Sequence, residues 1–168
     1  MKLVTLLLLL TSTTIAAPYS KSIVYVLEQL RQDKDPDKNL SFIGGCAVGY
    51  GGTPGTFFLL HAFILNRASR DDLLKMLSDH SPAVRLMAAK VLIHSERYES
   101  DAKEADRLLG DSAKVEVAEF GCIVETMPVG EAVRRLKTNK NFLGDSSSYQ
   151  LTDEPTPVEP PPPSKLGK

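Results

Sequence analysis

The stretch "LLKMLSDHSPAVRLMAAKVL", residues 73–92, carries the strongest structural signal in the sequence. Ser81-Pro82 is a typical helix start, with Ser as the N-cap and Pro at the first helical position. Beyond it, apolar residues recur at the i, i+3, i+4, i+7 and i+8 spacing of one helix face: Val84, Met87, Ala88, Val91 and Leu92. The stretch therefore predicts a short helix, a turn at "SDHSP" and a long helix.

Four further segments have helical patterns: residues 19–33, 56–68, 97–110 and 129–136. The first carries one apolar face and ends before Pro36, whereas the second is apolar on nearly all sides and indicates a well-covered helix. Ser69 and Asp72 form a capping-box-like pair ahead of the short helix. Gly110 is the predicted end of the helix over 97–110.

Residues 113–125, "AKVEVAEFGCIVE", are ambiguous. Val115 and Val117 alternate as in a strand, but Val117, Phe120 and Val124 have the spacing of a helix. A lone strand among helices would leave its backbone N–H and C=O groups without partners. We therefore expect a helix here, and the predicted fold class is all-α.

Long and short helices alternate along the chain, and similar features recur after about 30 residues. Pro54 and Pro82 each precede a longer helix, and Val84 and Val115 occupy comparable places. A period of this size is typical of a solenoid, in which each helix pair is covered only by its neighbours. We expect a short α-solenoid of about three helix pairs behind an N-terminal capping helix.

Residues 70–94 resemble the short bacterial kind of HEAT repeat. The residues that carry the likeness are Asp79, Pro82, Val84, Arg85, Ala88 and Ala89. In that family the Asp and the Arg bond within and between neighbouring repeats, while the Val and the alanines let helices pack closely. The resemblance implies an α-solenoid whose usual role is to hold another protein.

The neighbouring units match the HEAT pattern less well. Thr56 and Phe57 stand where the Val and the Arg would fall in the preceding unit. The following unit keeps Asp111 but has Glu116 at the position of Arg85. The polar ladder is therefore not expected to run through every unit, as is usual for terminal repeats.

The N-terminus has the parts of a secretory signal: Lys2, the apolar run 3–10 and the small residues of "TSTTIAAPYS". The alternatives are a buried core helix or an uncleaved anchor, but the apolar run is shorter than the roughly 20 residues of a membrane span. We expect a signal peptide over 1–17 and an exported protein, periplasmic or secreted. No integral membrane segment is expected after cleavage.

Residues 145–168 contain six of the eleven prolines and few residues that could be buried. This composition predicts a disordered tail with polyproline II character. A spacer to the envelope, or a ligand for a Pro-binding groove, are the alternatives. The folded domain is then expected over residues 18–144.

The Gly-rich stretch 44–55, "GGCAVGYGGTPG", is not a phosphate-binding loop by its context. It lacks the Lys of a P-loop, and no strand of a βαβ unit is predicted before it. We expect its glycines to allow close packing against the next helix. The net charge of −1, with no basic run, also argues against nucleic acid as a partner.

The three histidines do not form a motif that binds metal, since no two have the i, i+4 spacing of a helical zinc site. His61 is expected to be a hydrogen-bonded core residue, His80 lies in a turn, and His94 lies near a helix end where its charge suits the dipole. No metal or other cofactor is predicted.

Cys46 and Cys122 could form a disulfide in an oxidising compartment. In the predicted solenoid they lie about two repeats, or roughly 20 Å, apart, whereas a disulfide needs Cα atoms within about 7 Å. We therefore favour two buried thiols and keep the disulfide as the alternative.

The sequence as a whole predicts a non-catalytic module that binds or scaffolds a protein partner. One alternative is an enzyme with a cleft between the loop 44–55 and the repeats, where His61 or His80 would meet an acidic neighbour. Another is a chromophore lyase, a role of some HEAT-like proteins, but such lyases work inside cells and an export signal fits them poorly.

Overall fold

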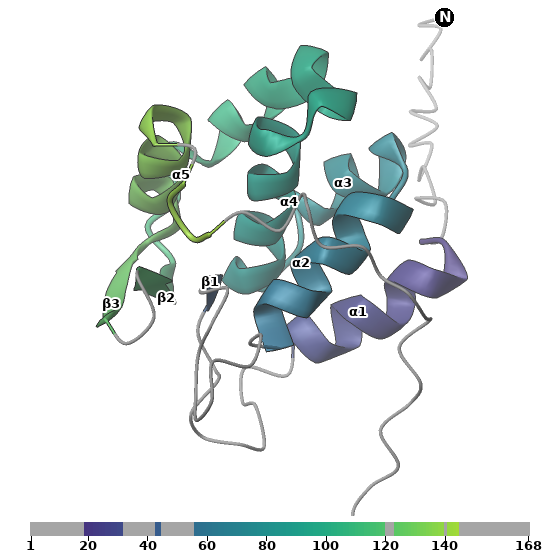
Figure 1. Ribbon diagram of the computed structural model, residues 1–168, viewed down its shortest axis with the longest axis horizontal. Coiled ribbons are helices and arrows are strands. Elements are labelled where there is room, and N and C mark those ends of the chain that lie inside the picture. The colour runs from purple at the N-terminus through teal and green to yellow at the C-terminus, as the bar shows by residue number, and fades with distance from the viewer. Residues whose placement is uncertain (1–18, 32–42, 45–55, 120–122, 140, 145–168) are drawn as a thin grey trace, which may run out of the picture.

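The chain is mainly helical in the part that the computed structural model describes, residues 19–31, 43–44, 56–119, 123–139 and 141–144 (Figure 1). Its helices are α1 (Lys21–Arg31), α2 (Thr56–Arg67), α3 (Arg70–Met76), α4 (Pro82–His94), the 3₁₀ helix η1 (Glu96–Leu108) and α5 (Val129–Thr138). Its strands are β1 (Ile43–Gly44), β2 (Lys114–Glu119) and β3 (Ile123–Pro128). The helices match the predicted segments, but the strands were not predicted.

Helix α4 lies at the centre of the molecule and packs against α1, α2, α3, η1, α5 and β2 (Figure 1). Its five predicted core residues are all buried, and so are the residues between Leu86 and Leu92 on its other sides. Burial of one such apolar side chain stabilises the fold by about 1.5–3 kcal/mol. The stretch that gave the strongest sequence signal is thus the central core element.

Helix α1 lies beside α2, and its predicted apolar face is fully covered (Figure 1). The predicted capping box at α3 is present, because Ser69 Oγ accepts from the Asp72 N–H at 3.1 Å and the Asp72 carboxylate accepts from the Ser69 N–H at 3.1 Å. The same carboxylate accepts from the Ser20 N–H at 3.3 Å. Asp72 therefore joins the start of α3 to the start of α1.

Two local predictions are confirmed in position but differ in detail. Ser81 stands at the N-cap of α4 with Pro82 after it, but its side chain makes no capping hydrogen bond. Its backbone N–H donates instead to Asp79 Oδ1 at 3.0 Å. The helix over 97–110 is a 3₁₀ helix with non-helical backbone at Tyr98, whose hydroxyl donates to the Ala68 carbonyl at 2.7 Å.

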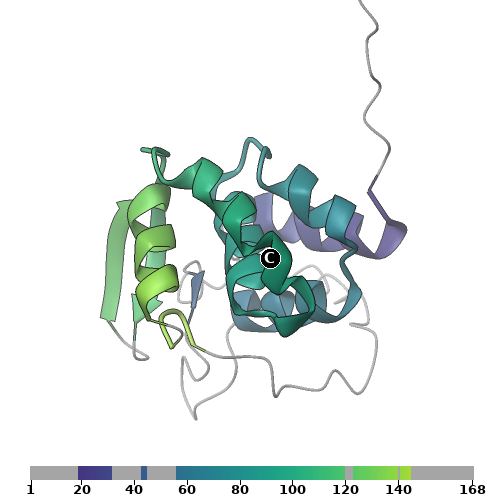
Figure 2. The same ribbon diagram turned by 90° about the horizontal axis from the view of Figure 1, so that it is seen from above.

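The helix predicted over 113–125 is wrong, so the fold is mainly helical with a small sheet and not all-α. β2 pairs with β3 as an antiparallel hairpin in which Val115 faces Met127 and Val117 faces Glu125. On its other side, β2 pairs in parallel with β1, Ile43 facing Val117 and Gly44 facing Ala118. These pairings supply the backbone partners that a lone strand would lack. Helix α5 lies along the hairpin (Figure 2).

Candidate functional site

A cavity of about 290 Å³ opens where the sheet meets the first turns of α2 and α4. The described residues that line it are Ile43, Phe57, Pro82, Ala83, Lys114, Val115, Glu116 and Thr126. Ile43, Phe57, Ala83 and Val115 are buried and give it an apolar floor. Lys114, Glu116 and Thr126 are exposed and form its rim.

The cavity lies beside residues 114–116 of β2, next to the pairing of β1 with β2. Within the described residues, β1 covers Val117 and Ala118 of β2, and no strand pairs with 114–116 on that side. Side chains that lie directly opposite each other in a sheet point to the same face. Ile43 and Val117 therefore share a face with Val115, and the cavity lies beside that face along the edge of β2.

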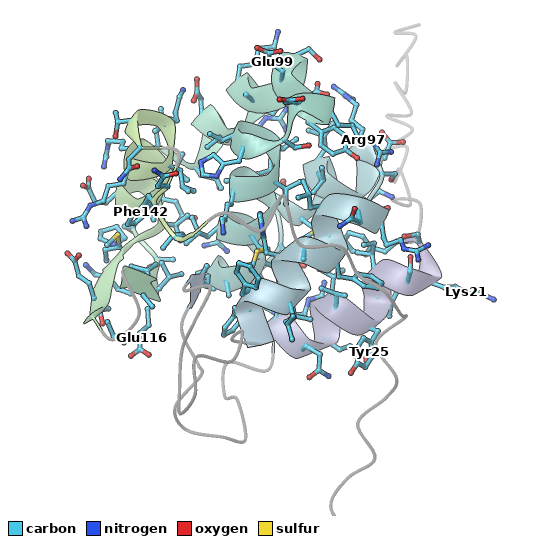
Figure 3. The ribbon with its side chains drawn as sticks, in the orientation of Figure 1. Lys21, Tyr25, Arg97, Glu99, Glu116 and Phe142 are labelled. Carbon is cyan, nitrogen blue, oxygen red and sulfur yellow. The ribbon has the colours of Figure 1, made fainter. Side chains whose placement is uncertain are left out.

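The rim carries two opposite charges that the described residues leave unpaired. On the β3 side, Lys114 faces Pro128 and Glu116 faces Thr126, so neither has a charged cross-strand partner. Figure 3 shows Glu116 pointing outward from the hairpin. By contrast, Glu125 of β3 accepts from Arg135 of α5 at 2.9 Å.

The predicted polar residues Asp79 and Arg85 form part of a ladder that joins three segments of the chain. Arg31 of α1 donates to Asp79 Oδ1 at 3.3 Å and to Oδ2 at 2.5 Å. Arg85 donates to the Asp79 and His80 carbonyls at 2.7 and 2.9 Å, and its Nε donates to Asp111 Oδ2 at 2.7 Å. Burial acts to raise the pKa of Asp79, but hydrogen bonds from Arg31 and the Ser81 N–H outweigh it and lower that pKa.

The other predicted structural residues lie in or beside this ladder and the core. Pro82 is the first residue of α4 and also lines the cavity, which sequence reasoning did not foresee. Val84 and Ala88 are fully buried. The residues that carry the HEAT resemblance therefore serve packing and interhelix bonding.

The histidines do not meet in the cavity. His61 is buried in α2, and burial, together with the charges of Lys90 and His94, holds its pKa well below the usual 6.5. His80 is exposed, with Nδ1 3.3 Å from Asp79 Oδ1, a carboxylate that also holds Arg31. His94, the last residue of α4, has Nε2 3.3 Å from the Leu136 carbonyl.

Lys90 is a second polar feature that sequence reasoning missed. It is only 1% exposed in the middle of α4, and its Nζ donates to the Leu143 carbonyl at 2.8 Å. Leu143 has a positive φ of 65°, which is uncommon for a residue other than glycine. Phe142 beside it lies under the Arg135 guanidinium (Figure 3). Lys90 thus holds the turn after α5 against the core helix.

Cys46, Cys122 and residues 45–55 of the Gly-rich stretch lie outside the described residues. The distance argument against a disulfide assumed two stacked repeats between the cysteines. The described residues do not test that assumption, and the choice between two buried thiols and a disulfide stays a prediction. The predicted signal peptide and the tail from 145 also lie outside the described part.

No known protein family and no curated protein matches this chain. Within the described ranges, none of the helices combines the length and the apolar character needed to cross a membrane. The same ranges hold no cluster of three or more His, Cys, Asp or Glu side chains that could bind a metal ion.

Proposed function

We propose that this chain is a protein-binding module that holds an extended segment of a partner protein at the cavity beside residues 114–116 of β2. The observation that carries the proposal is the cavity beside residues 114–116 of β2, with its apolar floor and charged rim. Addition of a strand to an open sheet edge is a common mode of peptide recognition, in which backbone hydrogen bonds supply affinity and pockets supply specificity.

The size and lining of the cavity favour a peptide side chain over a cofactor. Pockets for drug-sized ligands begin at about 300 Å³ and extend to about 1,000 Å³, and this cavity of about 290 Å³ lies at the lower limit. Its floor of Ile43, Phe57, Ala83 and Val115 is apolar. Alternate residues of an extended peptide would place one apolar side chain in it and leave charged neighbours at the rim.

The helical part is proposed to be a short HEAT-like solenoid that supports this edge. The support is the bonding of Arg85, which joins the Asp79 turn to Asp111 at the start of the next unit. A module of this kind is proposed to act outside the cytoplasm, on the basis of the signal-like residues 1–17.

The test is a selection of nine-residue peptides from a random display library on the purified protein, followed by NMR mapping of the bound peptide. We expect shifts at Ile43, Val115 and Thr126. Thr126→Arg, which places a long charged side chain at the exposed rim, should weaken binding at least tenfold with unchanged thermal stability. Thr138→Arg, at the exposed end of α5, is the matched control and should bind normally.

Two results would refute the proposal. One is a set of selected peptides whose shifts map away from the cavity. The other is binding that Thr126→Arg leaves unchanged. Ala83→Phe, which fills the cavity floor, provides a second variant, and its melting curve would confirm that it is folded before binding is measured.

A further inference from the structure

We propose that two copies of this chain associate through the outer edge of β3, as antiparallel strands related by a two-fold axis at Thr126. This inference goes beyond the proposed function, because it concerns the side of the hairpin that is turned away from β2. β3 is the last strand in the order β1-β2-β3, and residues 124–126 are exposed in succession. Val124 is 46% exposed, more than any other large apolar side chain in the described part of the chain.

The backbone of β3 directs hydrogen-bonding groups toward a further strand. The Val129 N–H donates to the Ala113 carbonyl at 2.9 Å, just beyond the paired ends of β2 and β3. In an antiparallel ladder, residues that bond to the neighbouring strand alternate with residues whose N–H and C=O point to the other side. By this alternation, the residues of β3 that point away from β2 are Val124, Thr126 and Pro128. β3 lies at the outer margin of the molecule in both Figure 1 and Figure 2, so this edge is turned away from the helices.

One register of self-pairing matches the side chains of this edge. If the axis passes through Thr126, each Thr126 lies opposite its equivalent in the second copy, and each Val124 lies opposite Pro128. Glu125 then lies opposite Met127, so no like charges are opposed. An axis through Glu125, the neighbouring register with the same hydrogen-bonding side, would place the two Glu125 side chains directly opposite each other, which is unfavourable.

A second copy suits this edge because the edge complements itself. An isologous contact repeats each interaction about the axis, so both Val124 side chains gain an apolar neighbour and the two Thr126 residues form a favourable cross-strand pair. Glu125, the one charged residue of β3, keeps its bond to Arg135 of its own chain at 2.9 Å. A single short strand buries little area, and interfaces below about 1,200 Å² are weak and transient. We therefore expect a dimer that forms at high protein concentration.

The test is sedimentation velocity of the purified protein from about 0.01 to 1 mM, where a weak interface is populated. Wild type should show a reversible monomer–dimer equilibrium. Val124→Lys should raise the dimer dissociation constant about tenfold or more, since each dimer loses two apolar contacts. Val24→Lys is the matched control, because Val24 on α1 is 41% exposed, and it should dimerise as wild type does. Val124 is not among the described residues that line the cavity, so Val124→Lys should leave peptide binding unchanged.

An isotope-filtered NOE experiment on mixed labelled and unlabelled protein tests the register without a variant. Residues of a non-hydrogen-bonded antiparallel pair have Cα atoms about 4.5 Å apart. We therefore expect contacts between the Hα atoms of Glu125 and Met127 across the two copies. Contacts between the two Glu125 residues would overturn the register. A protein that stays monomeric at about 1 mM, or a dimer that Val124→Lys leaves unchanged, would overturn the proposal. An equal loss of dimer in Val124→Lys and Val24→Lys would do the same.

Discussion

Gly130 gives the sharpest test of the packing between α5 and η1. It is the second residue of α5, and its N–H donates to the Asp111 carbonyl at 2.9 Å. A Cβ at this position would lie 2.5 Å from the Leu109 carbonyl oxygen and 2.9 Å from that of Leu108. Contacts below 3.0 Å do not occur for real Cβ atoms, so the backbone has to move. Gly130→Ala should therefore separate α5 from the end of η1.

The magnitude follows from two opposing effects. In an open helix, Ala is more favourable than Gly by about 1 kcal/mol. Insertion of a methyl group into a packed site typically costs about 1–3 kcal/mol, and the upper part of this range applies because the atoms contacted are backbone. We expect a net loss of about 2 kcal/mol, which lowers Tm by roughly 8 °C in a domain of this size.

The assay is thermal and urea unfolding followed by circular dichroism, with Gly110→Ala as the matched control. A Cβ at Gly110 meets nothing within 4 Å, and its φ is not in the left-handed region. Gly110→Ala should therefore leave stability unchanged or raise it by about 0.4–1 kcal/mol. If Gly130→Ala melts at or above the wild-type temperature, the close approach of α5 to η1 is incorrect.

Four further predictions concern polar groups of the core and of the ladder. Because the pKa of His61 lies well below 6.5 in the folded state, the unfolded state binds the proton first as the pH falls. The free energy of unfolding should therefore be constant above about pH 6.5 and decrease below it. His61→Gln should flatten this part of the pH profile, whereas His80→Gln should not. Because the pKa of Asp79 is lowered in the folded state, the free energy of unfolding should decrease further below about pH 4, and Asp79→Asn should remove this decrease. A free energy of unfolding that stays constant from pH 7 to 3 would contradict the assignments of both His61 and Asp79. Lys90→Met should lower the free energy of unfolding by about 1–3 kcal/mol, because the Leu143 carbonyl loses its hydrogen bond, and amide hydrogen exchange should rise first at 141–144. The control Lys103→Met, on the exposed side of η1, should change stability by less than about 0.5 kcal/mol. Equal effects of the two variants would refute the role of Lys90. For the ladder, a double-mutant cycle of Arg85→Met and Asp111→Asn should give a coupling of at least about 1 kcal/mol, and additive effects would show that the pair contributes nothing.

The helices could be predicted because their signals are local. The apolar faces of α1 and α4 recur at helical spacing, and the residues named from that spacing are buried. Ser69 and Asp72 lie three residues apart, so their capping box is also a local pattern. Even so, the pattern of α4 understated its burial, because Lys90 is charged in a run of apolar residues and is nevertheless covered.

The sheet was missed for a physical reason. The alternation of Val115 and Val117 was visible, but it was set aside because no strand partner was recognised. One partner, β3, follows almost at once, and its alternation is weak because Glu125 faces α5 and Val124 faces solvent. The other partner, β1, lies far away in the sequence. Neither pairing has a local signal of the kind that identifies a helix.

The candidate site depends on these long-range pairings, so the sequence alone could not locate it. Phe57, Ala83 and Val115 each fell within a segment that was predicted to be a helix. They meet at one cavity because β2 is a strand in a sheet that lies beside the first turns of α2 and α4. The Lys114 and Glu116 charges likewise did not indicate a site in the predicted helix, because residues two apart do not share a face of a helix. In a strand, Lys114 and Glu116 lie on the same face on either side of Val115, which points to the opposite face and is buried.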